Sequence, residues 1–127
     1  MAGGEAVSVA VGIGCRAGAT AEAIERLARE GLERAGLTAA VLCAPRGKAG
    51  PALADAAARL GLELRYIDEA DLAGADVVSH SLRVAALYGV GSVAEAAALL
   101  GAGTGARIVV AKFSAGGVSC AVAKGEP

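Results

Sequence analysis

The chain has 127 residues, which suffices for one domain with one hydrophobic core, and we expect a single domain over residues 1–127. Its 12 Lys and Arg residues nearly balance 13 Asp and Glu residues, so broad electrostatic binding of nucleic acid is excluded. No signal-peptide pattern opens the chain, and no apolar run approaches the roughly 20 residues that cross a bilayer. We therefore expect a cytoplasmic protein that binds neither nucleic acid nor a membrane.

The first predicted unit is a strand, a glycine-rich turn and a helix. Residues 6–11 form a small, β-branched run, whereas residues 21–35 repeat their apolar side chains at helical spacing. Thr20 is the expected N-cap of this helix and Gly36 its end. Its charged residues are expected to form a solvated face of Glu-before-Arg pairs at i, i+4, namely Glu22 with Arg26, Glu25 with Arg29 and Glu30 with Arg34.

The turn before this helix is the candidate ligand site. Gly12, Gly14 and Gly18 permit close approach to the backbone, and the helix start offers unpaired N–H donors and a partial positive charge. Both properties favour an anion. Arg16 adds a guanidinium, which binds carboxylate or phosphate in a bidentate manner. Cys15 is expected to have a lowered pKa there, and it is either a reactive thiol or a small residue that fits a crowded turn.

The other two cysteines have a simpler interpretation. Cys43 and Cys120 fall inside apolar runs, so both are expected in the core. The chain has no C-x-x-C pair and only one histidine, so we expect no disulfide scaffold, no metal site and no cofactor.

A second strand is predicted over residues 37–44, parallel to the first. The loop that follows carries Arg46 and Lys48. Because ligands of open α/β sheets bind beyond the carboxyl ends of the strands, this loop should lie near Cys15 and Arg16. Solvated surface charge is the alternative interpretation of its two cations.

The middle of the chain predicts shorter elements. A helix should run from Pro51 to Leu60 and end at Gly61, and residues 62–66 alternate like a strand near a sheet edge. One helical turn is expected around Leu72. The sequence Ser79-His80-Ser81 then precedes a short helix predicted over residues 82–88.

The last third predicts a helix and a hairpin. Ser92 and Glu95 match a capping box, in which each side chain satisfies a backbone N–H at the helix start, and Gly101 is the expected end. Strands over residues 107–113 and 118–123 are joined by a link too short for a parallel crossover. The fold class is therefore α/β, a three-layer α/β/α domain with a mixed, mostly parallel sheet and a C-terminal antiparallel hairpin.

Several motifs together resemble one family. They are G-I-G-C-R-A-G over residues 12–18, Ser81 and Val84 before Gly89, G-S-V-A-E-A-A-A-L over residues 91–99, Lys112, and S-C-A-V-A over residues 119–123. With them the chain resembles, over nearly its whole length, the CobE / CbiG C-terminal domain family of cobalamin (vitamin B12) biosynthesis. It is most similar to the single-domain, CobE-like form.

The resemblance implies binding of a precorrin or corrinoid intermediate, a carboxylate-rich tetrapyrrole, with other corrin-pathway enzymes as protein partners. It also implies assistance to lactone opening or to processing at the ring-contraction stage. Such a reaction needs a base, for which only His80 and Glu95 are candidates, so no catalytic residue is assigned. The expected ligand-binding residues are Gly12, Gly14, Cys15, Arg16, Gly18, Lys48, Ser81, Glu95 and Lys112.

Two alternatives come from other classes of protein. Gly12, Gly14 and Gly18 also form G-x-G-x-x-x-G, one residue longer than the dinucleotide fingerprint, and Arg46 would then meet a 2′-phosphate. This is a small nucleotide- or dinucleotide-binding module. The other alternative is a structural or interaction subunit without a ligand.

Overall fold

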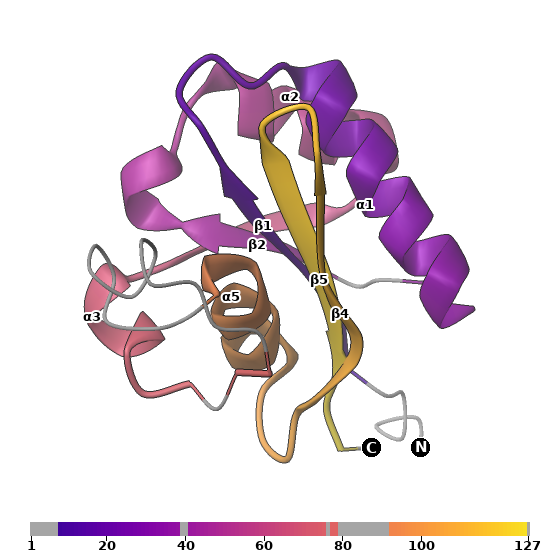
Figure 1. Ribbon diagram of the computed structural model, residues 1–127, viewed down its shortest axis with the longest axis vertical. Coiled ribbons are helices and arrows are strands. Elements are labelled where there is room, and N and C mark those ends of the chain that lie inside the picture. Colours follow the sequence, from indigo (N-terminus) through magenta and orange to yellow (C-terminus); the bar gives the residue numbers. More distant parts are fainter. Residues whose placement is uncertain (1–7, 39–40, 76, 79–91, 127) are drawn as a thin grey trace.

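The computed structural model describes residues 8–38, 41–75, 77–78 and 92–126, which form five strands and the helices around them (Figure 1). The strands are β1 (Val9–Cys15), β2 (Val41–Pro45), β3 (Glu63–Ile67), β4 (Arg107–Ala115) and β5 (Val118–Lys124). The helices are α1 (Ala21–Ala35), α2 (Pro51–Leu60), α3 (Glu69–Leu72) and α5 (Val93–Ala102), with a 3-10 turn η2 (Arg46–Lys48) after β2.

The sheet has the order β3-β2-β1-β5-β4. The first three strands pair in parallel, while β5 is antiparallel to both β1 and β4, so only β5 runs against the other four. Figure 1 shows α1 and α2 on one face of this sheet and α3 and α5 on the other. The predicted three-layer α/β/α class, its mixed sheet and its C-terminal hairpin are confirmed.

Local signals placed α1 and the hairpin correctly. The Thr20 hydroxyl accepts the N–H of Ala23 at 3.1 Å, and Gly36 ends α1 at a φ of 66°. The hairpin turns on Gly116 and Gly117, whose φ angles of 62° and 78° are the left-handed values that a two-residue turn requires.

Three boundaries differ from the predictions. The strand β2 begins at Val41, because Leu37 still belongs to the helix end, where its N–H donates to the Leu32 carbonyl at 3.2 Å. The strand β3 lies one residue later than expected, at Glu63–Ile67. Gly101 does not end α5, which continues to Ala102 with Gly103 as its cap. The helix predicted over residues 82–88 lies outside the described residues.

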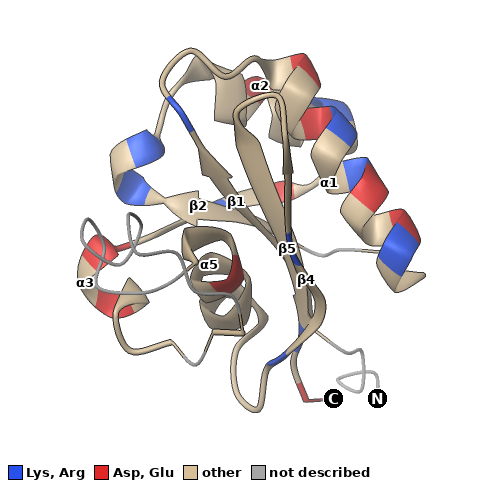
Figure 2. Cartoon of the chain, viewed as in Figure 1, with Lys and Arg blue, Asp and Glu red and all other residues tan. Residues whose placement is uncertain are grey.

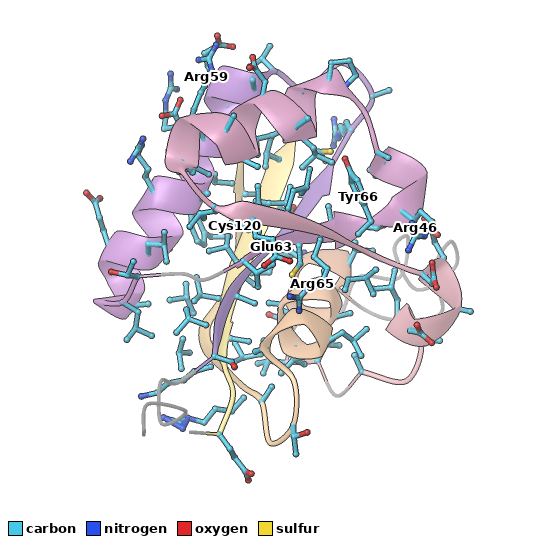
Figure 3. All side chains as sticks on the ribbon, turned by 180° about the vertical axis from the view of Figure 1, so that it is seen from behind. Arg46, Arg59, Glu63, Arg65, Tyr66 and Cys120 are labelled. Atoms are coloured by element: carbon cyan, nitrogen blue, oxygen red, sulfur yellow. The ribbon has the colours of Figure 1, made fainter. Side chains whose placement is uncertain are left out.

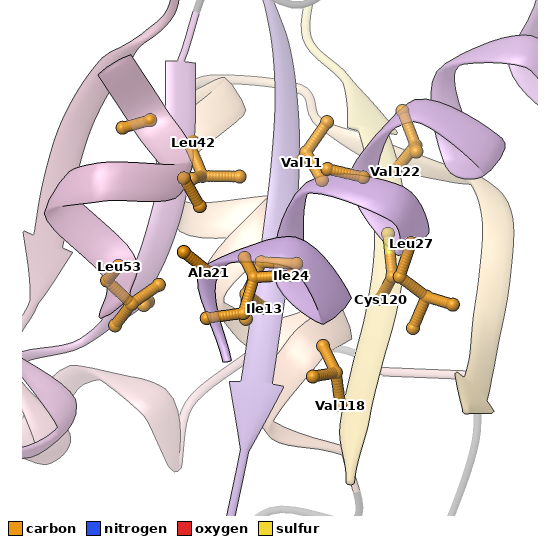
Figure 4. Packing of buried hydrophobic residues seen from close by; sticks show 14 of the residues in the cluster. Val11, Ile13, Ala21, Ile24, Leu27, Leu42, Leu53, Val118, Cys120 and Val122 are labelled. Atoms are coloured by element: carbon orange, nitrogen blue, oxygen red, sulfur yellow. The ribbon is translucent and has the colours of Figure 1, made fainter. Parts of the chain in front are cut away.

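The two faces of β1 carry side chains of different size. Val9, Val11 and Ile13 point toward α1 and α2 and belong to the larger core cluster (Figure 4). On the opposite face, Ala10, Gly12 and Gly14 lie against α5. The side of β1 that faces α5 is therefore nearly bare, whereas its other side carries branched side chains.

We call the contact of α5 with the bare face the small-residue seam, made by Ala10, Gly12 and Gly14 of β1 with Ala94, Ala98 and Gly101 of α5. A methyl group on Gly12 would stand 1.9 Å from the Ala94 carbonyl oxygen, and one on Gly101 would stand 2.2 Å from the Cys43 Sγ atom. Both glycines are thus needed because helix and sheet approach so closely.

Charged residues are most numerous on α1, and others lie on α2, α3, η2, β3 and β4, whereas the only charged residue of α5 is Glu95 (Figure 2). Two of the predicted pairs on α1 form, Glu25 with Arg29 and Glu30 with Arg34. Glu22 instead pairs with Arg59 of α2 at 3.1 Å. Within the described ranges, no helix has the length and apolar composition needed to span a membrane.

Candidate functional site

The candidate site lies where β1 and β2 end. The register pairs Gly12 with Cys43, so β1 ends at Cys15 at the level where η2 begins, and Arg16 follows directly. Lys48 lies close enough to Cys15 for its positive charge to lower the pKa of the thiol. The predicted proximity of this loop to Cys15 is therefore confirmed.

Arg16 is exposed and lies beside the β4–β5 hairpin. Its N–H donates to the Gly117 carbonyl at 2.9 Å, and its side-chain stem passes 3.9 Å from where a Gly117 methyl group would stand. This contact was not predictable from the sequence, because Gly117 lies about a hundred residues further along the chain. In the described part of the chain, no carboxylate forms an ion pair with the Arg16 guanidinium.

The N-terminal turn of α1 meets part of its own hydrogen-bonding needs. The Thr20 hydroxyl accepts the N–H of Ala23, and the backbone N–H of Glu22, together with Arg59, lowers the pKa of the Glu22 carboxyl. The start of α1 therefore offers a ligand fewer unpaired backbone N–H donors than we predicted from the sequence. The capacity of this edge to bind an anion thus depends mainly on its side-chain cations.

The predicted low pKa of Cys15 is wrong. The thiol is half-buried, and burial raises its pKa above the ordinary value of 9.0 by more than the charge of Lys48 lowers it. Burial raises the pKa of the two core cysteines, Cys43 and Cys120, to about 12. Cys15 remains the most accessible of the three thiols.

The two cations of η2 have different surroundings. Arg46 is 61% exposed and forms an ion pair with Asp68 after β3 (Figure 3), while the neighbouring N–H of Gly47 donates to Glu69 at 2.6 Å. Lys48 is half-buried and has no ion pair with a described carboxylate. Arg46 therefore fits the surface-charge interpretation, and Lys48 is the cation of this loop that remains available.

The three glycines of the turn, Gly12, Gly14 and Gly18, have different structural surroundings. Gly12 is buried in the small-residue seam, and Gly18 takes a φ of 86° with open space around it. A methyl group added at Gly14 would meet Val93 at an ordinary 3.7 Å, so the start of α5 lies beside the carboxyl end of β1. Their predicted contact with a ligand remains a prediction.

Glu95 is fully buried in the first turn of α5. The Ser92 half of the predicted capping box is confirmed, because its hydroxyl accepts the Glu95 N–H at 3.2 Å. The Glu95 carboxylate reaches beyond the helix, and accepts the N–H of Val78 at 2.7 Å and that of Lys112 at 2.9 Å. It therefore joins three separate segments of the chain.

The remaining candidate residues fall in two groups. Lys112 lies on the edge strand β4. Its neighbour Phe113 pairs with Cys120 of β5, and Cys120 pairs in turn with Ile13 of β1. Lys112 is therefore level with the last residues of β1. Ser81 and His80 lie outside the described residues. Among the described residues, no three His, Cys, Asp or Glu side chains are grouped as metal ligands would be.

Comparisons with known proteins agree with this architecture. The family model described as "Cobalamin synthesis G C-terminus" matches residues 9–123. A crystal structure of CobE, described as a protein from the cobalamin (vitamin B12) biosynthetic pathway, is 32% identical with a TM-score of 0.81, and the match covers 93% of this chain and 90% of that chain. A crystal structure of the cobalamin biosynthesis protein ChiG from Agrobacterium tumefaciens is 36% identical with a TM-score of 0.72, and the match covers 91% of this chain and 96% of that chain. No curated protein sequence matches the chain.

Proposed function

Because the chain belongs to the family of the cobalamin synthesis G C-terminus, which places it in cobalamin biosynthesis, we propose that it binds a precorrin or corrinoid intermediate where β1 and β2 end. The ligand would be recognised through its peripheral carboxylates by Arg16, Lys48 and Lys112.

One observation carries this proposal: Arg16 and Lys48 flank Cys15 without a described carboxylate partner, whereas Arg46 beside them is paired with Asp68. A cation that lacks an internal partner at the edge of a parallel sheet is available to an anionic ligand. Arg16 supplies a planar, bidentate donor, and Lys48 supplies a point charge.

The spacing of the cations favours a large polycarboxylate over a single phosphate. Lys48 follows β2 and Lys112 lies on β4, so three strand intervals separate them in the sheet order. At roughly 4.8 Å for each interval, the two lysines belong to strands about 14 Å apart. A tetrapyrrole with acetate and propionate groups around its rim is extended enough to meet cations at that separation.

We propose binding and assign no bond-breaking step to the described residues. A lactone-opening reaction needs a base that can activate water. Glu95 is completely buried and already accepts two backbone N–H groups through its carboxylate, so it does not face a ligand at the surface.

The test is an absorbance titration of the purified protein with cobyrinic acid, a corrinoid whose side chains are free carboxylates. Arg16→Ala should weaken binding by about 1.5 to 3 kcal/mol, the range for a hydrogen bond to a charged group, and leave the melting temperature little changed. Arg26→Ala is the matched control, because it removes from the adjacent helix another exposed arginine that forms no ion pair with a described carboxylate.

Equal affinity in the Arg16 variant and the wild type would place the site elsewhere. NADP and ATP, titrated in parallel, test the nucleotide-binding alternative. Tighter binding of either nucleotide than of cobyrinic acid would replace the proposed ligand class.

A further inference from the structure

The strand β4 contains an irregularity beside the candidate site. Its register with β5 shifts between Val110 and Phe113, which pair with Val122 and Cys120. Two residues of β4, Ala111 and Lys112, therefore stand opposite the single residue Ala121. Such a β-bulge leaves a backbone group out of the ladder and redirects the neighbouring side chain.

The backbone group that the bulge releases is bound by Glu95. The N–H of Lys112 donates to Glu95 Oε2 at 2.9 Å, and the other carboxylate oxygen, Oε1, accepts the N–H of Val78 at 2.7 Å. Both donors lie 17 residues from Glu95, one before it and one after it. The carboxylate thus ties the bulge to the segment after α3 and to the first turn of α5.

We infer that Glu95 is a positioning residue, whose buried carboxylate holds the β4 bulge and thereby directs the Lys112 side chain toward the ligand. This inference rests on the proposed function, because Lys112 is one of the three cations assigned to the corrinoid. Glu95 itself does not touch the ligand.

A carboxylate suits this position better than an amide does. Its two oxygens both accept, so one side chain satisfies two N–H donors on opposite sides. In Glu95→Gln one of these donors faces an NH₂ group, and the buried N–H of Val78 or Lys112 loses its partner. The bulge would then lose the contact that fixes it.

The test is a double-mutant cycle with cobyrinic acid as the probe. The variants are Glu95→Gln, Lys112→Ala and the two together, each titrated by absorbance. Both single variants should weaken binding about tenfold or more, and the double variant should bind no more weakly than either. Residues that act through one contact show this loss of additivity.

A control separates positioning from general stability. Ser92→Ala removes a different polar contact at the start of α5, because the Ser92 hydroxyl accepts the Glu95 N–H, but it leaves the carboxylate in place. This variant should unfold more readily than the wild type and still bind cobyrinic acid with unchanged affinity. Equal loss of affinity in the Ser92 and Glu95 variants would reduce Glu95 to a stabilising role.

A second readout needs no ligand. Amide hydrogen exchange at Val78 or at Lys112 should be faster in Glu95→Gln than in the wild type, because one of these two N–H groups has lost its acceptor. If Glu95→Gln does not fold, Glu95→Asp, which keeps the charge but shortens the side chain, replaces it in both measurements.

The outcomes are distinct. Additive losses in the cycle would mean that Glu95 acts independently of Lys112, and wild-type affinity in Glu95→Gln would remove it from the site. Unchanged exchange at both Val78 and Lys112 would show that the carboxylate does not hold these two N–H groups or the bulge. Failure of the wild type to bind cobyrinic acid would overturn the proposed function and the ligand role of Lys112, while the exchange data still decide what Glu95 holds.

Discussion

Replacing Gly12 by alanine tests whether the first glycine of the turn is required by packing or by a ligand. An added methyl group would stand 1.9 Å from the Ala94 carbonyl oxygen and 2.6 Å from the Ala98 nitrogen. Both are backbone atoms of α5, so no side-chain rotation relieves the overlap. The helix itself must move away from β1.

The size of the effect follows from these distances. A carbon atom approaches a carbonyl oxygen to about 3.3 Å, so α5 must shift locally by roughly 1.4 Å. Overpacking in a rigid core lowers the free energy of unfolding by about 1 to 3 kcal/mol. Because a whole helix must be displaced here, we expect a loss at or above the upper limit of that range. We expect Gly12→Ala to lower the free energy of unfolding by at least about 3 kcal/mol, and the melting temperature by more than about 10 °C.

Gly14→Ala is the matched control, since it makes the same change two residues along the same face of β1. Its methyl group would meet Val93 at an ordinary 3.7 Å, and its φ is not positive. This variant should match the wild type or gain about 0.4 to 1 kcal/mol from a less flexible unfolded chain. Urea unfolding of both variants gives the comparison, and equal stability of the two would refute the packing explanation of Gly12.

Iodoacetamide should alkylate Cys15 much faster than the two buried cysteines. The alkylation rate of Cys15 should still rise above pH 9, because burial raises the pKa of this thiol and the reactive thiolate forms only at higher pH. A rate that levels off below pH 8 would contradict this direction of the pKa shift. Gly101→Ala should be strongly destabilising in urea unfolding, because its methyl group would stand 2.2 Å from the Cys43 Sγ atom. Adding Cys43→Ala should restore part of the loss, and purely additive losses would show that this sulfur is not what excludes the methyl group.

Features set by neighbouring residues were predictable from the sequence. The ends of α1 follow from Thr20 and Gly36, which cap the helix through contacts with residues three or four positions away. The hairpin follows from a link too short for any other connection. Together with the alternation of strands and helices, these local signals were enough for the three-layer class.

Features set by distant residues were not predictable in this way. The pattern S-x-x-E predicts a helix cap, yet the Glu95 carboxylate reaches residues 17 positions away on either side. The glycine-rich turn suggests a ligand cradle, but the position of α5 supplies the reason for Gly12. The pKa of Cys15 depends on how far the folded chain buries the thiol, which neighbouring charges alone do not reveal.

The small-residue seam also constrains how this sequence can change over time. At Gly101 and Cys43 the order of two substitutions matters, because alanine at position 101 is tolerable only after the sulfur has gone. A lineage that first replaces Cys43 by alanine passes through a variant with a small cavity, whereas the reverse order passes through a variant with a severe overlap. A residue larger than glycine at position 101 thus requires a residue smaller than cysteine at position 43. The two positions should therefore covary among descendants of this chain.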